Sequence, residues 1–249
     1  MKIFIYDDTF EGLLTAIYDS FYSKEIPTSI YGKNQSNTPL LLGEIIEITT
    51  ENHKYKKVKN GIITKIDFYA LRKIYMVYLS NHEDKALIIF KYLKIAFKLG
   101  HDVHSFLNID IIRLVEDINR RVSIECHRFE GFIRFNYIDE KFLYSSIEPD
   151  NDILELLYDH FKNRFSKEYF IIHDIFREKA LIYNGISYEI IEMDKTTYEK
   201  LKSHDDEYTN LWKAYFKSTT IEERKNLKLQ CRMMPKRYWK HILETSKDI

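Results

Sequence analysis

The chain has 249 residues, and its 38 basic and 38 acidic side chains give a formal net charge of zero at pH 7. This length suffices for one large domain or two small ones with a full hydrophobic core. The balanced charge excludes a general polycation, so affinity for nucleic acid would require local segregation of charge. No apolar run approaches the roughly 20 residues that cross a bilayer, and we expect no membrane role.

The chain contains only two cysteines, Cys126 and Cys231, and its start lacks the pattern of a secretory signal peptide. These features predict a reducing, cytoplasmic environment without disulfides. Two distant thiols cannot hold an iron–sulfur cluster. The common motifs for nucleotide hydrolysis, dinucleotide binding, zinc ribbons and serine hydrolysis are also absent, so we expect no metal and no cofactor.

The first part of the chain predicts a strand, a turn and a helix. The apolar run over residues 2–8 ends in Asp7 and Asp8, and apolar residues at helical spacing follow over residues 9–22, with Thr9 as the N-cap. The two carboxylates could bind Mg²⁺, but strand termination and helix capping are favoured. Residues 26–43 are rich in proline and glycine and predict a loop, and a strand is expected over 44–50.

The remaining elements alternate between helical and strand-like patterns. Residues 52–122 predict three or four helices, with Gly100 as a C-cap. Period-two alternation predicts a hairpin over 124–147, with its turn at 138–141. We then expect a helix at 152–165, strands at 168–174, 179–185 and 187–193, and helices at about 206–217, 220–232 and 235–245.

This order predicts an α+β fold with a helical N-terminal half, a small central antiparallel or mixed sheet and a helical C-terminus. We interpret residues 1–249 as a single domain, in which residues 52–122 form a helical subdomain. No internal repeat and no obvious linker interrupts the chain.

The C-terminal segment carries the most concentrated charge. Residues 224–241 contain seven lysines and arginines and no aspartate or glutamate. On one helix, Arg224, Lys228 and Arg232 would form a stripe of like charges that favours a polyanion. Pro235 is expected at the first position of another helix, where Lys236 and Arg237 would hold a phosphate.

The aromatic neighbours of these cations have two interpretations. Tyr238 and Trp239 could stack on an unpaired base. Alternatively, the basic face pairs with acidic residues of its own fold, and Trp239 fills the core.

A second candidate surface lies at HRFEGFIRF, residues 127–135. If these residues form a strand, Arg128, Phe132 and Arg134 share one face, as in platforms that bind single strands. Gly131 would then allow a ligand or another backbone to approach closely. The alternative is a solvated sheet face with a local arginine–glutamate pair.

Two histidines are candidates for acid–base chemistry. His173 and Asp174 end an apolar strand and Arg177 follows, so a general base oriented by a carboxylate is conceivable. His127 is the other candidate. The simpler interpretation is that His173 satisfies hydrogen bonds at the end of a strand.

Several longer motifs resemble one protein family. They are YDDTFEGLLTAIYDSF at 6–21, HRFEGFIRF at 127–135, EPDNDILELLYDHFKNRF at 148–165, EYFIIHDIFREKALIY at 168–183, and LWKAYF with ERKNLKLQCRMMPKRYW within 211–239. Together they are similar to the bacterial DNA-repair or DNA-metabolism family that is linked to a radical SAM protein of the DNA modification and repair type. Related chains are fused to a uracil-DNA glycosylase-like domain. The family pattern favours glycine after Asp7, whereas this chain has Asp8. Because glycine adopts a left-handed backbone conformation most easily, this departure argues against a left-handed turn at residue 8.

The resemblance implies a role beside a radical SAM partner, and the residues suggest how. Our leading hypothesis is an accessory protein that binds DNA, either damaged or locally single-stranded. The expected nucleic-acid contacts are Arg128, Arg134, Arg177, Arg224, Lys228, Arg232, Lys236, Arg237, Tyr238 and Trp239. The alternatives are a glycosylase-like or nuclease-like enzyme that uses His127, His173 and Asp174, and a structural adaptor of the partner.

Overall fold

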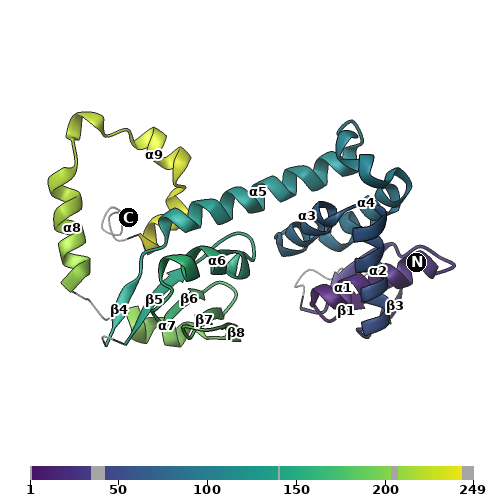
Figure 1. Ribbon diagram of the computed structural model, residues 1–249, viewed down its shortest axis with the longest axis horizontal. Coiled ribbons are helices and arrows are strands. Elements are labelled where there is room, and N and C mark those ends of the chain that lie inside the picture. Colours follow the sequence, from purple (N-terminus) through teal and green to yellow (C-terminus); the bar gives the residue numbers. More distant parts are fainter. Residues whose placement is uncertain (1, 35–42, 140, 203–206, 243–249) are drawn as a thin grey trace. The chain divides into compact units, whose positions relative to one another are not determined.

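The computed structural model describes residues 2–34, 43–139, 141–202 and 207–242 (Figure 1). The chain divides into two compact units, residues 1–123 and 124–249. The expected α+β class is confirmed, because helices surround small sheets and lie at both ends of the chain. The helical region predicted over 52–122 belongs to the first unit. The prediction of a single domain remains a prediction.

The first unit contains a three-stranded parallel sheet in the order β2-β1-β3. β1 spans Lys2–Tyr6, β2 Ser29–Gly32 and β3 Glu44–Glu47. β1 pairs with β2 from Ile3↔Ser29 onward and with β3 from Lys2↔Glu44 onward. The strands at 2–8 and 44–50 were therefore predicted correctly. The loop expected over 26–43 was wrong for 29–32, because a short buried run pairs with the central strand.

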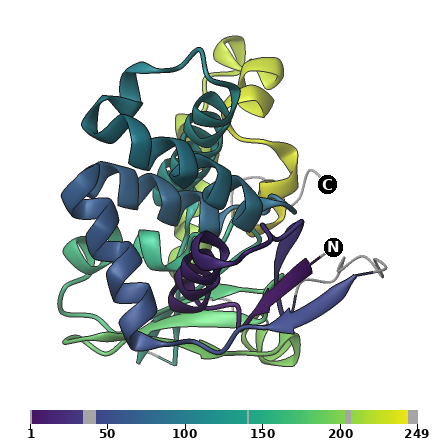
Figure 2. The same ribbon diagram turned by 90° about the vertical axis from the view of Figure 1, so that its right-hand side faces the viewer.

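Helix α1, Phe10–Tyr22, follows β1 and contacts it (Figure 2). The predicted cap is confirmed, since Oγ1 of Thr9 accepts a hydrogen bond of 2.9 Å from the Gly12 amide. Asp7 accepts bonds from the hydroxyls of Thr9 and Thr50, each at 2.6 Å. Burial opposes these bonds, but together they lower the pKa of Asp7. The Asp7 carboxylate thus forms hydrogen bonds at the end of β1 and the start of α1, as the capping interpretation expected.

Asp8 does adopt the left-handed conformation that its identity had put in question, with φ of 62°. Its carboxylate accepts a bond of 2.7 Å from the Asn34 amide, and its carbonyl oxygen accepts one of 2.5 Å from the Tyr78 hydroxyl. These contacts explain how a residue other than glycine is held there. A Cβ atom on Gly32 would collide with Oδ1 of Asp8.

Helices account for the rest of the first unit, as predicted. They are α2 Asn52–Lys65, α3 Phe68–Leu79, α4 Lys85–Leu99, the short 3₁₀ helix η1 Gly100–Ser105 and the first half of α5 Asp110–Phe132. Buried residues recur along their inner faces, including Ile62, Ile74 and Leu93. Gly100 is confirmed as the C-cap of α4, with φ of 62°.

The second unit contains the last part of α5 and a five-stranded mixed sheet in the order β4-β5-β6-β7-β8. The strands are β4 Asn136–Ile138, β5 Phe142–Ile147, β6 Phe170–Asp174, β7 Lys179–Tyr183 and β8 Tyr188–Glu192. Only β5 and β6 pair in parallel, and α6, Leu154–Arg164, connects them and contacts β7. The helix at 152–165 and the last three strands were predicted correctly.

The hairpin predicted over 124–147 is only partly correct. The end of its first arm and its second arm exist as β4 and β5, which pair antiparallel from Asn136↔Tyr144 to Ile138↔Phe142. The rest of its first arm was wrong, because α5 continues through Phe132. Buried residues along α5 recur at helical spacing, at Val115, Ile118, Val122, Cys126 and Phe129. That spacing, which begins before residue 124, outweighs the short alternation that suggested a strand.

The chain ends in helical segments. They are α7 Lys195–Lys202, α8 Glu207–Thr219, the 3₁₀ turn η2 Glu222–Arg224, α9 Leu227–Met233 and the 3₁₀ helix η3 Lys236–His241. The helix predicted over 220–232 is therefore split into η2 and α9. The predicted helix over 235–245 is a six-residue 3₁₀ segment, and the residues after 242 lie outside the described part of the chain.

Candidate nucleic-acid interface

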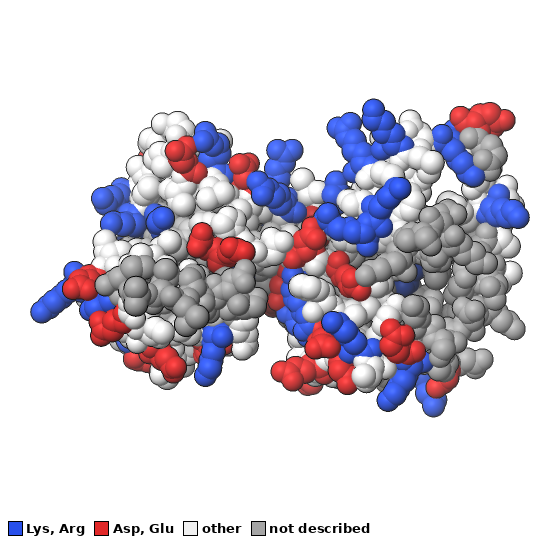
Figure 3. Space-filling model, turned by 180° about the vertical axis from the view of Figure 1, so that it is seen from behind, with Lys and Arg blue, Asp and Glu red and all other residues white. Residues whose placement is uncertain are grey.

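The basic C-terminal segment is exposed in the structure. Five cations from the end of η2 to the start of η3 have exposed side chains: Arg224, Lys225, Lys228, Arg232 and Lys236. The ion pairs found among the described residues do not include Arg224, Lys228 or Arg232. Lys and Arg side chains gather over the α9 region in Figure 3. A polyanion could reach these charges from solvent.

The geometry of the stripe differs from the predicted one. Lys228 and Arg232 lie four residues apart on α9, but Arg224 belongs to η2, and residues 225–226 separate the two helices. The Asn226 side chain caps α9 by accepting a bond of 3.0 Å from the Leu229 amide. The cations therefore share a segment rather than one continuous helix.

The expected phosphate site at a helix start is not formed as predicted. Pro235 precedes η3 as its N-cap instead of occupying the first helical position. Arg237 donates to Oδ2 of Asp150 and, at 2.8 Å, to the Tyr238 hydroxyl. Arg237 already has an internal carboxylate partner, so among the side chains described at this end Lys236 is the exposed cation that remains.

Tyr238 belongs to the core, and its expected contact with a base was wrong. The residue is 2% exposed, and its ring lies edge-on to Phe129 with 4.8 Å between centroids. Its hydroxyl donates a bond of 2.6 Å to Oε1 of Glu125. Burial, and next the bond to Glu125, raise the pKa of Tyr238 far above its ordinary value, so the hydroxyl stays a donor.

Trp239 is also in the core, as the simpler interpretation expected. It is 4% exposed, and its indole Nε1 donates a bond of 2.9 Å to the Met234 carbonyl oxygen. The Lys236 ammonium lies 5.8 Å from the centre of the Trp239 ring. This burial leaves the indole unable to stack on an exposed base.

A buried carboxylate, Glu125, organises the base of the segment. Besides the Tyr238 hydroxyl, it accepts bonds from the amides of Asp150 and Asn151 and from the Asn151 side chain, at 2.6–2.9 Å. We call these residues, together with Arg237, the Glu125 network. It connects η3 to α5 and to the loop between β5 and α6, and it fixes the chain just beyond the exposed cations. Glu125 was not among the predicted site residues, because a single glutamate in a helix gives no signal of burial.

The three remaining candidate arginines differ in their availability. Arg177 donates to Asp174 at 2.8 Å and to the carbonyl oxygens of Pro149 and Asp150 at 3.0 and 2.6 Å. Arg134 donates to the Gly131 and Ile133 carbonyl oxygens at the end of α5. These bonds assign both side chains to the fold. Arg128 is half-buried on α5, so the platform based on strand alternation does not exist. Space around Gly131 is open, and no close approach requires a glycine there.

The candidate acid–base residues are not brought together. His127 projects from α5 with 88% of its side chain exposed and lies 3.1 Å from Glu130. His173 is fully buried in β6. Its Nε2 lies 2.9 Å from the Met193 carbonyl oxygen, which can only accept, so Nε2 carries the proton and Nδ1 accepts from Tyr144 at 2.8 Å.

Burial lowers the pKa of His173, opposed by its bond to Met193 and by Asp174. The Asp174 side chain is also fully buried and accepts from the amides of Phe176 and Arg177 at 3.1 and 3.2 Å. Burial raises the pKa of Asp174 although Arg177 opposes the shift. Both residues therefore have structural partners at the end of β6, as the simpler interpretation held.

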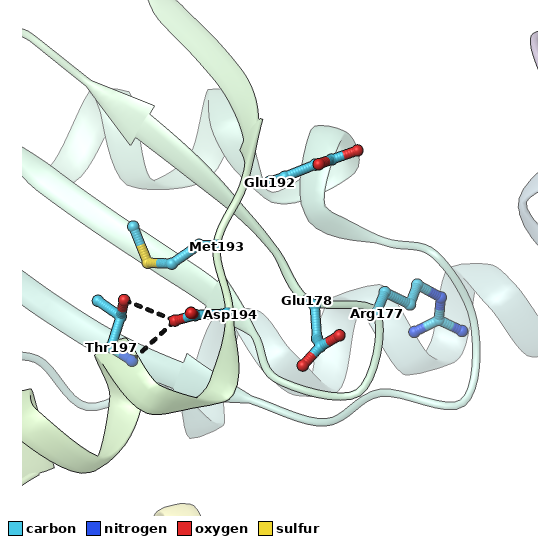
Figure 4. Close-up of a pocket in the computed structure, with 6 residues that line it drawn as sticks. All are labelled: Arg177, Glu178, Glu192, Met193, Asp194 and Thr197. Atoms are coloured by element: carbon cyan, nitrogen blue, oxygen red, sulfur yellow. Dashed lines mark hydrogen bonds between the residues drawn. The ribbon is translucent and has the colours of Figure 1, made fainter.

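An open hollow of about 680 Å³ lies beside β8 (Figure 4). Its lining residues are Arg177, Glu178, Glu192, Met193, Asp194 and Thr197. Asp194 is engaged at the start of α7, where it accepts bonds from the Thr197 amide and hydroxyl at 3.0 and 2.8 Å. This part of the surface, beside the edge strand β8, is acidic because it carries the carboxylates of Glu178 and Glu192. It would repel a phosphate backbone.

Among the residues that the structure describes, no helix is long and apolar enough to cross a membrane. Within the same described ranges, no group of three or more histidine, cysteine, aspartate or glutamate side chains is placed to hold a metal ion.

Comparison with protein families finds a match to the model described as DUF4130, a domain of unknown function, over residues 83–244. The matched range extends from the start of α4 to the end of η3 and includes the basic segment and the Glu125 network. The searches of curated proteins and of solved structures find no match.

Proposed function

The chain belongs to the DUF4130 family, and we propose that it is a nucleic-acid-binding accessory protein of DNA repair or DNA metabolism. The observation that carries this proposal is the run of exposed cations from Arg224 to Lys236, in which no acidic residue occurs. These positive charges lie close together along the segment and repel one another, and bound phosphates would neutralise them.

 
Arg224, Lys228, Arg232 and Lys236 would hold phosphates, because their charged ends face solvent. Such contacts position a protein on nucleic acid without reading its sequence. Tyr238, Trp239 and Arg237 support the segment from within the fold, and they are not proposed as contacts.

The finer parts of the proposal rest on the resemblance described above. They are that the nucleic acid is damaged or locally single-stranded DNA, and that a radical SAM protein supplies the redox chemistry of base modification or repair. An association with uracil-DNA glycosylase-like domains belongs to the same context. The two cysteines lie on different helices, Cys126 on α5 and Cys231 on α9. We therefore assign any radical chemistry to the partner.

The test compares two variants that change the net charge by the same amount. Arg224→Glu/Lys228→Glu/Arg232→Glu reverses the proposed contacts. Lys56→Glu/Lys59→Glu/Lys94→Glu reverses three exposed lysines of α2 and α4. Fluorescence anisotropy with labelled single-stranded and duplex DNA should show binding by the natural protein and by the second variant. The first variant should bind at least roughly a hundredfold more weakly.

Equal weakening by the two variants would show a general effect of net charge and would contradict a specific interface. Circular dichroism of both variants provides the control for folding. Since all six substituted side chains are exposed, neither variant should lose its helical signal.

A second candidate function, a structural adaptor of the radical SAM partner, is favoured by one observation. The segment from α8 to α9 exposes seven large apolar side chains, each at least 40% exposed: Leu211, Tyr215, Phe216, Ile221, Leu227, Leu229 and Met233. Apolar and aromatic side chains of this kind are enriched at the centres of protein interfaces. If the adaptor role is correct, Leu227→Ser/Met233→Ser should abolish partner binding and leave DNA binding intact.

A further inference from the structure

Strand β8 forms an exposed edge of the five-stranded sheet. It pairs with β7 on one side, and it is the last strand in the order of the sheet. Ile190 and Ile191 project to opposite faces, yet they are 40% and 38% exposed. Both faces of the strand are therefore accessible at these two residues, whereas three of the five residues of β7 are buried.

The backbone of β8 has a defined outward side. The Met193 amide donates to the Glu178 carbonyl oxygen at 2.8 Å, and the Asn184 amide donates to the Ser187 carbonyl oxygen at 3.2 Å. Residues of an antiparallel pair alternate between bonded and non-bonded positions, so odd-numbered residues face β7. Tyr188, Ile190 and Glu192 consequently direct their N–H and C=O groups away from the sheet.

The strand lacks the usual protection of an edge. Natural edge strands are commonly blocked by lysine, proline or a bulge, but β8 reads YEIIE and pairs with β7 in a regular register. Tyr188 anchors one end, since its ring lies 4.0 Å from that of Tyr158 and its hydroxyl donates to Glu155 at 3.2 Å. An anchored strand with open backbone groups is suited to accept another strand.

The charge around β8 specifies the partner. Glu189 and Glu192 are exposed on the strand, and Glu178 and Asp194 line the adjoining hollow (Figure 4). Arg177, the cation of that hollow, is already bonded to Asp174 and to two carbonyl oxygens. Glu189 shares one face of β8 with Ile191, and Glu192 shares the other face with Ile190. An incoming strand with two adjacent apolar residues between two basic residues would match both the isoleucines and the carboxylates.

We propose that β8 is a docking edge for an extended segment of a partner protein in which two adjacent apolar residues lie between lysines or arginines. The segment adds a sixth strand to the sheet, with main-chain bonds to Tyr188, Ile190 and Glu192. Its basic side chains pair with Glu189, Glu192 and the carboxylates of the hollow. This inference is independent of the nucleic-acid interface, because it uses an acidic surface that does not include the basic segment.

The test uses a short fluorescein-labelled peptide that contains the sequence Lys-Val-Val-Lys as the probe, and its counterpart replaces each lysine with glutamate. Anisotropy in low-salt buffer should show binding to the full chain, and the glutamate counterpart should not bind. Hydrogen exchange should slow at the amides of Ile190 and Glu192 when the peptide is present. Slowing confined to other parts of the chain, or equal binding of the two peptides, would overturn the proposal.

Two variants locate the site. Ile190→Pro removes an outward N–H group and leaves the bonds to β7 in place, so the affinity for the peptide should fall by at least roughly tenfold. Glu189→Lys/Glu192→Lys should cause a similar loss through charge. Unchanged affinity in both variants would overturn the proposal.

Strand β3 offers a stringent control, because Glu44–Glu47 has the same sequence, EIIE, as residues 189–192 and also ends its sheet. It differs from β8 in contributing no residue to the acidic hollow. Glu44→Lys/Glu47→Lys should leave peptide affinity unchanged, and loss of binding in this variant alone would place the site elsewhere. Analytical ultracentrifugation without peptide tests whether a second copy of this chain occupies β8 instead. A dimer that Ile190→Pro converts to a monomer would show that a second copy, rather than a basic segment, occupies β8.

Discussion

The hydroxyl of Tyr238 donates a hydrogen bond of 2.6 Å to the buried carboxylate of Glu125 across 113 residues of sequence. Residues that appeared suited to contact a ligand instead connect the end of the chain to its core. The exposed cations from Arg224 to Lys236 lie immediately before this connection. The Glu125 network thus positions the proposed interface without belonging to it.

Loss of the Tyr238 hydroxyl should destabilise the protein. In Tyr238→Phe, the Glu125 carboxylate loses one of its four donors while it remains buried, so we expect unfolding to become easier by about 1–3 kcal/mol. Urea denaturation followed by circular dichroism measures the difference. Tyr169→Phe, at a tyrosine that is 57% exposed, is the control and should change stability by less than about 0.5 kcal/mol.

Substitution of Trp239 distinguishes a structural role of its side chain from a role in stacking on a base. Trp239→Phe removes the bond to the Met234 carbonyl oxygen and part of the buried volume, and it should cost about 1–2 kcal/mol of stability. Affinity for single-stranded DNA should stay the same at a temperature where the variant is fully folded. A large loss of affinity by the folded variant would instead restore base stacking as the function of Trp239.

The buried His173 should make stability depend on pH. Because the pKa of His173 is lower in the folded protein than the ordinary value of about 6.5, the unfolded chain takes up the proton first as pH falls. Its contribution is therefore complete above about pH 6.5 and is lost as pH falls through the folded pKa, by at most about 1.4 kcal/mol per pH unit.

The variant His173→Gln isolates this effect. Glutamine keeps a donor for the Met193 carbonyl oxygen but does not titrate, so the difference in stability between the two proteins should shrink as pH falls below about 6.5. Asp174 is common to both proteins, and its contribution cancels in the comparison. A difference that stays constant between neutral and mildly acidic pH would show that His173 is not buried in its neutral form.

Gly32 and Asp8 should be energetically coupled. Gly32→Ala places a Cβ atom against Oδ1 of Asp8 and should cost about 1–3 kcal/mol. In the background of Asp8→Gly the opposing carboxylate is absent, and glycine also suits the backbone φ of 62°. The cost of Gly32→Ala should therefore be much smaller in that background. A double-mutant cycle measured by thermal unfolding that gave additive effects would contradict the contact.

The sequence was sufficient for elements with a clear period or a clear cap. The helix that starts after Thr9, the end of α4 at Gly100 and the strands β6 to β8 follow from side-chain spacing and local backbone chemistry. Strand β2 was missed because Pro27, Gly32 and Pro39 suggest a loop, whereas its pairing partner β1 is distant in sequence. Such pairing leaves no local signal.

The candidate site was harder to predict than the fold. The sequence identified the concentration of cations, but it could not show that Arg237 and Arg177 have carboxylate partners at Asp150 and Asp174. Burial of Tyr238 depends on Glu125, which lies far away in the sequence. The exposed or buried state of an aromatic side chain depends on such tertiary contacts, so the local sequence around Tyr238 could not show that its ring is buried.

The most direct test of the central claim is the salt dependence of DNA binding. The logarithm of the association constant for a labelled duplex should fall linearly with the logarithm of salt concentration, by about 0.9 for each phosphate that the protein neutralises. Arg224→Ala/Lys228→Ala/Arg232→Ala should reduce this slope by about two to three. No binding at low salt, or the same slope in the variant, would contradict a nucleic-acid interface at this segment.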